Sequence, residues 1–521
     1  MKRKILLLLF FIFVLILLPA RGEDIWSLYL KKVSNVVSII EEHYFRDIDH
    51  ENLAYSSIKG LLQTLDPHSH FIETDNLARM REEFKGKFYG LGIQIQKQED
   101  RLVVITPIEG TPAYRLGIQA GDIISHINGE STKPITSLDA VQKLRGPKGT
   151  KVNITIVRED LEKPLELTVV RGEVPLLSVP YAFILQDGIG YIFIRNFAET
   201  TTKEFREKLK VLAKKGMKNL ILDLRGNAGG PLVQAIEISD EFLQKDTLIV
   251  IIKGRKKEHD QEFRALRDNQ HENLPLVILI NQGSASASEI VAGAIKDNDR
   301  GIIVGENSFG KGLVQTLFSL KSNTAIALTT GKYLTPSGRS IQKDYSHLQD
   351  YMYGRRETPE EEREVRYTTG GRKVLGQGGI SPDYEIKVSR SRFWFELMSK
   401  GVFFSYGRRF AEHKTPLSKK LIFIGKDKGV PESYQDKIAI GKELEVGSEF
   451  IEDFRNYLKT KKIEFDPEKF VKAEEEIKRE LKREIFSSLW GIEAGIKAYR
   501  ETDPVVLKAI EVFSEETNLI Q

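Results

Sequence analysis

The chain has 521 residues, too many for one hydrophobic core, so we expect roughly three or four domains. Hydrophobic residues make up 40% and charged residues 29% of it, a balance typical of folded rather than disordered proteins. The absence of cysteine excludes thiol nucleophiles, disulfide bonds, cysteine metal sites and a lipid anchor on an N-terminal cysteine.

Residues 1–22 have the order of a secretory signal peptide. Basic residues at positions 2–4 precede an uncharged apolar run at 5–18, and small residues follow at 20 and 22. The run is shorter than the ~20 residues that cross a bilayer as a helix. We therefore predict cleavage before Glu23 and export to the periplasm or another extracytoplasmic space. If the segment is retained, it would anchor the protein at a membrane.

Removing this segment changes the charge of the protein. The whole chain has 78 Lys and Arg against 74 Asp and Glu, and residues 1–22 hold four of the basic residues and none of the acidic ones. The remaining chain is therefore neutral, with 74 residues of each sign. Since nucleic-acid binding requires a basic surface, we expect no nucleic-acid partner.

Residues 23–85 are predicted to form an N-terminal helical region. Apolar residues from Trp26 to Ile40 recur near helical spacing, and a second helix over about 51–65 should stop at Asp66-Pro67. The stretch LDPHSHF that includes this stop holds two histidines, which we interpret as part of a structural loop.

Residues 86–172 change to short β-rich runs, which predict a compact β-barrel-like domain. One amphipathic helix fits residues 136–145. The runs are IQIQ near 93–96, LVVIT at 102–106, DIISHING at 122–129, VNITIVR at 152–158 and LELTVV at 165–170.

Residues 173–390 alternate strands with helices. The strands are continuous apolar runs, as expected for strands buried on both faces, and the alternation predicts an α/β core with parallel pairing. The predicted strands are 190–197, 219–226, 247–253, 274–281 and 300–305, and the predicted helices are 201–215, 231–244 and 285–296.

Two further regions are polar or strongly charged. Residues 345–375 are predicted to be an exposed insertion or loop. Residues 391–521 are predicted to be a helical region, with long helical periodicity over 465–492. The mixed charges there fit a solvated face or a partner helix better than nucleic acid. Helices at both ends of the chain are compatible with a homo-oligomer.

The stretch QGSASASEI, residues 282–290, lies at a predicted strand-to-helix turn. Ser286 and Glu289 have the spacing of a helix capping box, and Ser284 and Ser288 are other candidate caps, so one interpretation is purely structural. The other is catalytic. A helix N-terminus offers unpaired N–H groups and about half a positive charge, which would stabilise an oxyanion beside a serine. No histidine lies at the neighbouring strand ends, so a Ser-His-Asp triad is not indicated.

Lys311, in the stretch GENSFGKGLVQTLF, is the candidate base for such a serine. The glycines beside it allow close backbone approach, and on a strand Lys311 and Gln315 would point the same way. The glutamine amide could then hold the lysine amine. To act as a base near neutral pH, an amine must fall from a pKa of ~10.4 to about 7–8, which burial can produce.

A third stretch, LDLRGNAGG at 222–230, ends a predicted buried strand and opens into a helix. Its glycines let backbone N–H groups face a ligand, so Gly229 or Gly230 could supply an oxyanion donor. Asp223 and Arg225 also fit a purely structural pair. The nine histidines are scattered and HExxH is absent, so we predict no metal site.

Together these stretches resemble the carboxyl-terminal processing proteases, the tail-specific serine peptidases with a Ser/Lys dyad. The resemblance covers most of residues 35–390. The motifs that carry it stand in the family's order: LDPHSHF, FYGLGI, LDLRGNAGG, NQGSASASEIVAGAI, FGKGLVQ, LTPSGRSIQ and GGISPD. Ala228 departs from the family, which often has proline there, and the segment between LTPSGRSIQ and GGISPD is longer than usual.

The resemblance implies roles for individual residues. Ser286 would be the nucleophile and Lys311, 25 residues later, the base, with Gln315 holding the amine. The oxyanion donors would be the N–H groups of Gly229 or Gly230 and of Ala287.

The resemblance also implies a fold, with a crotonase-like α/β protease core at 173–390 and a PDZ domain at 86–172 inserted ahead of it. PDZ domains add an extended peptide tail to a sheet edge, and loop N–H groups bind its terminal carboxylate. The residues that match this loop are Gly90, Leu91, Gly92 and Ile93.

We therefore predict an exported serine endopeptidase that binds C-terminal tails of protein substrates and needs no metal or other cofactor. Two alternatives stay open. One is a catalytically silent peptide-binding scaffold on the same fold. The other is a crotonase-type acyl-CoA enzyme, which the signal segment and the PDZ domain argue against.

Overall fold

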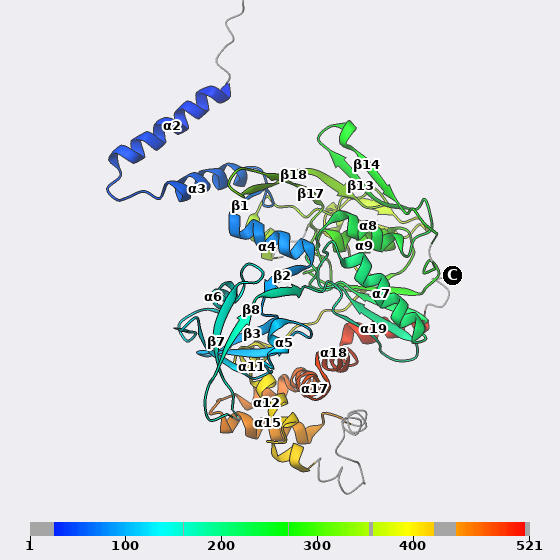
Figure 1. The fold of residues 1–521 in the computed structure, drawn as a ribbon. Helices are drawn as coiled ribbons and strands as arrows, with labels where there is room; N and C mark the ends of the chain where they lie inside the picture. The colour runs from blue at the N-terminus through cyan, green and yellow to red at the C-terminus, as the bar shows by residue number, and fades with distance from the viewer. Residues whose placement is uncertain (1–24, 160, 269, 354–357, 421–443, 516–521) are drawn as a thin grey trace, which may run out of the picture. The chain divides into compact units, whose positions relative to one another are not determined.

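The computed structural model describes residues 25–159, 161–268, 270–353, 358–420 and 444–515 (Figure 1). The predicted signal peptide, residues 1–22, lies outside these ranges. The chain divides into two compact units, residues 1–71 and residues 72–521.

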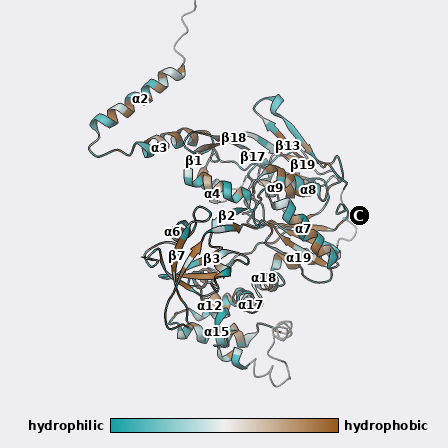
Figure 2. Ribbon diagram, in the orientation of Figure 1, coloured by the Kyte–Doolittle hydropathy of each residue, from teal (hydrophilic) through white to brown (hydrophobic). Residues whose placement is uncertain are grey.

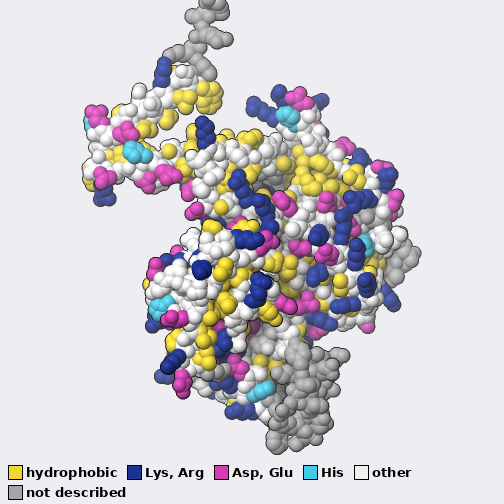
Figure 3. All heavy atoms as spheres, in the orientation of Figure 1, with side chains coloured by type: hydrophobic (Ala, Val, Ile, Leu, Met, Phe, Trp, Pro, Cys, Tyr) yellow, Lys and Arg dark blue, Asp and Glu magenta, His cyan; other side chains and the backbone are white. Residues whose placement is uncertain are grey.

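The described part of the first unit contains two helices, α2 (Ile25–His43) and α3 (His50–Gln63), and most of β1 (His70–Ile72). α3 begins after Asp49, whose side chain accepts a hydrogen bond from the Asn52 N–H (3.0 Å). α2 has no buried residue, and apolar and polar side chains alternate along it (Figures 2 and 3). In the parts of the chain that the structure describes, no helix is both long and apolar enough to cross a membrane.

The β-rich runs predicted between 86 and 172 form an antiparallel sheet in the order β3-β4-β5-β7-β8, with β6 paired to β5. β3 is an edge strand, and α6 (Ser137–Leu144) packs beside it. α6 begins in a capping box between Thr136 and Asp139. The strands of this sheet are β3 (Ile93–Gln98), β4 (Arg101–Pro107), β5 (Ile123–Ile127), β6 (Glu130–Ser131), β7 (Lys151–Val157) and β8 (Leu165–Val170). The elements around the sheet are α4 (Thr74–Lys85), which precedes it, β2 (Lys87–Gly90), α5 (Pro112–Arg115) and β9 (Gly172–Pro175).

A parallel sheet forms the centre of the second unit, in the order β10-β11-β12-β15-β16-β21. β11 to β21 pair in parallel, and β10 is added antiparallel at one edge. Every residue of β15 is buried, as predicted for an apolar strand covered on both faces. The strands are β10 (Tyr181–Ile184), β11 (Ile189–Phe193), β12 (Asn219–Asp223), β15 (Leu276–Ile280), β16 (Ile302–Gly305) and β21 (Tyr384–Glu385).

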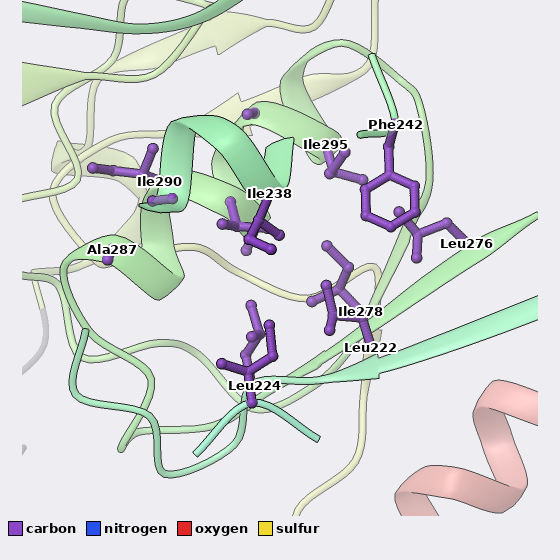
Figure 4. Packing of buried hydrophobic residues seen from close by; sticks show 14 of the residues in the cluster. Leu222, Leu224, Ile238, Phe242, Leu276, Ile278, Ala287, Ile290 and Ile295 are labelled. Atoms are coloured by element: carbon purple, nitrogen blue, oxygen red, sulfur yellow. The ribbon is translucent and has the colours of Figure 1, made fainter. Parts of the chain in front are cut away.

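Helices cover both faces of this sheet. Alternate strand residues such as Leu222 and Ile278 face α7 (Thr201–Lys214), α8 (Leu232–Asp240) and α9 (Ala287–Asp297), and they belong to one buried cluster with Ile238 of α8 (Figure 4). The residues between them, such as Ile221, face α19 (Pro504–Glu515). A C-terminal helix outside the stretch of family resemblance therefore completes the core.

The strand predicted at 247–253 does not join the parallel sheet, so this part of the prediction was wrong. β13 (Leu248–Gly254) pairs antiparallel with β14 (Gln261–Arg264) and β18 (Ala325–Leu334), and β17 (Leu313–Ser319) pairs with β18. β13 packs on α8 and α9, so α9 lies between two sheets and is buried at every residue. An apolar run does not distinguish a strand within a central sheet from one packed on helices. A short 3₁₀ turn, η1 (Lys257–His259), follows β13.

Residues 345–375 are not simply the exposed loop that their polar composition predicts. Their described part contains α10 (Leu348–Tyr353), the 3₁₀ turn η2 (Glu360–Glu362) and a hairpin of β19 (Val365–Tyr367) and β20 (Lys373–Leu375). The hairpin is fixed to the protein interior, because the buried Arg339 donates a hydrogen bond to the Leu375 carbonyl (2.6 Å). Tyr351 is also buried.

The C-terminal helical region has a core of its own. Phe403, Phe454 and Phe470 meet there, together with Ile477 and Leu481 from one face of α17. The helix predicted over 465–492 is divided into α16 and α17. Besides α19, the helices that the structure describes in this region are α11 (Arg392–Ser399), α12 (Val402–Ala411), α15 (Ser448–Thr460), α16 (Pro467–Lys472), α17 (Glu474–Trp490) and α18 (Ile492–Arg500).

Candidate active site

Two of the serines in the stretch QGSASASEI have structural roles. The hydroxyl of Ser284 donates a hydrogen bond to the Leu224 carbonyl (2.8 Å), and that of Ser288 donates to the Asn227 carbonyl (2.8 Å). Both side chains are fully buried, and they tie the turn before α9 to the turn after β12. Ser286 is only half-buried, so it is the most accessible of the three residues.

Ser286 has an unusual backbone conformation. It immediately precedes α9 with φ of 55° and ψ of −112°. A residue other than glycine held at a positive φ costs on the order of 1–3 kcal/mol, and such strain is common at functional sites. The conformation is held by bonds on both sides: Tyr333 donates to the Ser286 carbonyl (3.3 Å), and the Ser286 N–H donates to Glu289 (2.8 Å).

Glu289 connects the serine turn to the segment that carries Lys311. Its carboxylate is 0% exposed. Oε2 accepts the N–H groups of Ser286 (2.8 Å) and Lys311 (3.0 Å). Oε1 accepts the Ser308 hydroxyl (2.6 Å) and the Gly310 N–H (2.7 Å). Burial raises the pKa of Glu289 above its ordinary value, although these four hydrogen bonds act in the opposite direction.

The Lys311 amine donates a hydrogen bond to Oε1 of Gln315 (2.6 Å), so these two predicted site residues are in contact. They do not meet through the regular strand that the sequence analysis assumed. β17 begins only at Leu313, and its register shifts between Val314 and Gln315. An amide oxygen holds the amine in place without adding the negative charge that would favour its protonated form.

The predicted oxyanion donors lie close to the serine, but they differ in availability. A side chain on Gly229 would overlap the Ala285 carbonyl and Ser286, so only glycine fits there. The Gly229 N–H is engaged, because it donates to Oδ1 of Asn227 (2.9 Å). No hydrogen bond donated by the Gly230 or Ala287 N–H is found among the described residues.

A buried cluster of charges holds the other end of the LDLRGNAGG turn. Arg225 donates to Asp223 (2.6 Å) and forms an ion pair with Asp503 (2.8 Å), which lies just before α19. Arg500 also pairs with Asp503 (2.8 Å), and the Tyr191 hydroxyl donates to Asp223 (2.7 Å). Burial alone would raise the pKa of Asp503, but the two arginines lower it to about 2. Asp223, buried against the same arginines, also has a lowered pKa.

The predicted carboxylate-binding loop follows β2. Leu91 is buried in the core of the β3–β8 domain, and Gly92 has a φ of 80°. A side chain on Gly92 would overlap Thr111, so glycine is required. The Leu91 and Gly92 N–H groups donate to no acceptor among the described residues, and Ile93 begins the edge strand β3.

Sequence reasoning missed two residues of this site. Glu289 was considered only as a helix cap, although its carboxylate also reaches the lysine segment. Asp503 gave no signal, since it lies 278 residues from its partner Arg225. Within the described ranges, no group of three or more His, Asp or Glu residues is placed to hold a metal ion.

Comparisons with known proteins match two regions of the chain. The family model "Peptidase family S41" matches residues 188–347, and the model "PDZ domain" matches residues 103–158. The solved structure titled photosystem II D1 C-terminal processing protease is 26% identical with a TM-score of 0.36, and the alignment covers 68% of this chain and 86% of that one.

Curated relatives cover a longer part of the chain. This chain is 40% identical over 317 residues to a carboxy-terminal-processing protease of Bartonella bacilliformis, and the alignment covers 60% of this chain and 72% of the relative. It is 34% identical over 313 residues to the carboxy-terminal processing protease CtpA of Bacillus subtilis, covering 60% of this chain and 66% of that protein. The chain therefore belongs to the carboxy-terminal-processing proteases, serine-type peptidases of family S41 that here include a PDZ domain.

Proposed function

We propose that this protein is an exported endopeptidase that binds the C-terminal tails of protein substrates through its PDZ domain and cleaves them with a Ser286/Lys311 dyad. The observation that carries the proposal is the shared contact of Glu289, whose Oε2 accepts the N–H groups of both residues. One carboxylate oxygen thus holds the serine turn and the lysine segment next to each other. A crotonase-like arrangement of the core is part of the proposal.

In the proposed reaction, the neutral Lys311 amine removes the proton from the Ser286 hydroxyl as its oxygen attacks the scissile carbonyl. The strained backbone of Ser286 presents the hydroxyl at the start of α9. Gln315 supports the neutral amine as a hydrogen-bond acceptor. Lys311 then protonates the leaving amine, and water hydrolyses the acyl-enzyme with the same lysine as base.

The tetrahedral intermediate requires N–H donors for its oxyanion. The Ala287 N–H lies directly after the nucleophile in the first turn of α9, and we assign it as one donor. Gly230 is the better second candidate, because the Gly229 N–H is already bonded to Asn227 in this conformation. If Gly229 acts instead, its peptide must first leave Asn227.

The edge strand β3 of the PDZ domain supports the proposal of tail binding. β3 pairs only with β4 within its sheet, so its other edge can pair with an added peptide strand. Gly90, Leu91, Gly92 and Ile93 lead into that edge, and the N–H groups of Leu91 and Gly92 would donate hydrogen bonds to a terminal carboxylate. We expect amidation of a substrate's C-terminus to raise KM more than it lowers kcat.

Cleavage of unfolded β-casein by residues 23–521 tests the proposal. We expect wild-type cleavage that is lost in Ser286→Ala and in Lys311→Ala. Ser399→Ala and Lys210→Ala, two exposed positions away from the site, are the matched controls and should cleave normally. Cleavage by Ser286→Ala would exclude the proposed nucleophile. Intact casein with the wild-type protein would favour a silent peptide-binding scaffold, whereas family membership already argues against an acyl-CoA enzyme.

Export has a separate test. When the full chain is produced in a bacterial host, we expect the protein recovered from outside the cytoplasm to begin at Glu23. Intact-mass measurement distinguishes this product from the uncleaved chain. An intact N-terminus in the membrane fraction would show that the segment is an anchor, and an intact N-terminus in the cytoplasm would contradict export.

A further inference from the structure

Tyr351 connects the insertion at 345–375 to the lysine segment. Tyr351 of α10 is 3% exposed, although it lies in a stretch whose composition predicts a solvated loop. Its ring packs edge-to-face on Phe309, with 5.3 Å between the ring centroids. Its hydroxyl accepts a hydrogen bond from the Gln342 side-chain amide (3.3 Å).

These two contacts of Tyr351, with Phe309 and Gln342, both lead to the segment around Lys311. Phe309 stands two residues before the lysine, and its N–H donates to the Ser284 carbonyl (2.9 Å) in the serine turn. Gln342 binds on the other side of the lysine, where its Oε1 accepts the Gly312 N–H (2.9 Å). Tyr351 therefore contacts the supports on both sides of the lysine.

The segment needs such support because glycines flank the lysine. Gly310 has a φ of 90°, a conformation open to glycine and strained for other residues. Its carbonyl accepts the Lys343 N–H (3.0 Å), and a side chain at Gly310 would overlap Lys343. Two glycines give the backbone around Lys311 more freedom than any other pair of residues would, so contacts from outside must fix it.

We propose that Tyr351 is a positioning residue for Lys311. By packing on Phe309 and binding Gln342, it holds residues 309–312 in the conformation that presents the lysine amine to Ser286. This inference rests on the proposed Ser286/Lys311 dyad. It gives a function to the insertion at 345–375.

Steady-state cleavage of a fluorogenic peptide by the mature protein, with kcat and KM measured separately, tests this role. Tyr351→Leu keeps an apolar side chain but removes the ring and the hydroxyl. We expect kcat to fall by about 10–100-fold, because small displacements of a catalytic group are costly, while KM stays unchanged. Tyr351→Phe keeps the ring contact with Phe309 and should restore most of kcat.

Two further variants complete the experiment. Tyr367→Leu makes the same substitution in the same insertion at a residue that is 64% exposed, and it should behave as wild type. Gln342→Met keeps Tyr351 itself but removes both the acceptor for the Gly312 N–H and the donor to the Tyr351 hydroxyl, so it should also lower kcat. It provides the test if Tyr351→Leu does not fold, as judged by thermal melting.

The outcomes separate this inference from the proposed function. Full activity in Lys311→Ala would refute the dyad and with it the positioning role. A working dyad with wild-type kcat in folded Tyr351→Leu or Gln342→Met would overturn the positioning role alone. A loss confined to KM would assign the insertion to substrate binding and would also overturn it.

Discussion

Two buried carboxylates hold the turns on either side of the candidate active site, and they are stabilised differently. Glu289, between the serine and the lysine, is held by three backbone N–H groups and one hydroxyl. Asp503, behind the LDLRGNAGG turn, is held by Arg225 and Arg500. Accordingly, the pKa of Glu289 is raised by burial, whereas that of Asp503 is lowered to about 2.

The difference suggests different roles. Hydrogen bonds to backbone N–H groups are directional, so Glu289 fixes the positions of the two segments that it joins. Ion pairs tolerate more variation in geometry, and Asp503 joins a C-terminal helix to the core through its charge. Changes at Glu289 should therefore affect catalysis most, and changes at Asp503 should affect stability most.

Glu289→Gln provides the strongest test of this contrast. The amide keeps the shape of the side chain but replaces one acceptor oxygen by an NH₂ group that faces donors. We expect kcat to fall by at least ~100-fold, since both the serine and the lysine move, and stability to fall by about 3 kcal/mol. Activity assays and denaturant unfolding measure the two effects.

Glu207→Gln is the control for this variant, because Glu207 is an exposed residue of α7. It should match wild type in both measurements. If a folded Glu289→Gln protein retained wild-type kcat, the carboxylate would be only a helix cap.

Asp503→Asn should have the opposite pattern, with a larger effect on stability than on kcat. Removing one charge leaves Arg225 and Arg500 buried with Asp223 as their remaining close carboxylate. Breaking a buried ion pair by removing one partner costs about 3–5 kcal/mol, and we expect the lower end because Asp223 remains. Thermal unfolding measures this loss. A decrease in kcat as large as that of Glu289→Gln would contradict the division of roles.

The same contrast predicts a dependence of stability on pH. The pKa of Asp503 is about 2 in the folded chain against an ordinary value of 3.8 for an aspartate, so its contribution to stability is complete above pH 3.8 and is lost as the pH falls through about 2. This amounts to about 2 kcal/mol. Unfolding free energies measured between pH 5 and 2 should fall less steeply in Asp503→Asn. Parallel curves for the two proteins would refute the assignment.

Local patterns in the sequence predict part of this site and not the rest. Apolar runs predict β12 and β15, and the structure has a turn after each of these strands, as predicted. Local pattern could not separate Ser286 from its neighbours, because caps and nucleophiles occupy the same kind of turn. Long-range hydrogen bonds distinguish the three serines, because the carbonyl acceptors of Ser284 and Ser288 lie 60 and 61 residues earlier in the chain.

The residues that the sequence analysis missed depend on contacts of this kind. Asp503 has the local pattern of any helix cap, and only the packing of α19 on the central sheet brings it to Arg225. Tyr351 lies in a charged segment whose composition predicts exposure, and only the folding of the insertion buries it. Periodicity detects which face of an element is apolar, but it does not identify the element that covers it.

The smallest expected effects come from removing one neutral hydroxyl donor from each of the two carboxylate clusters, the one around Asp503 and the one around Glu289. Tyr191→Phe removes the hydroxyl that donates to Asp223, but Arg225 still binds this carboxylate, so we expect a loss of about 1 kcal/mol in unfolding free energy. Ser308→Ala removes a donor to Glu289 and also leaves the Ile380 N–H without its acceptor. It should cost more than Tyr191→Phe, and it alone should lower kcat, because neutral donors hold Glu289 in place. Equal losses of stability with unchanged kcat in both variants would show that the two carboxylates are held in the same way.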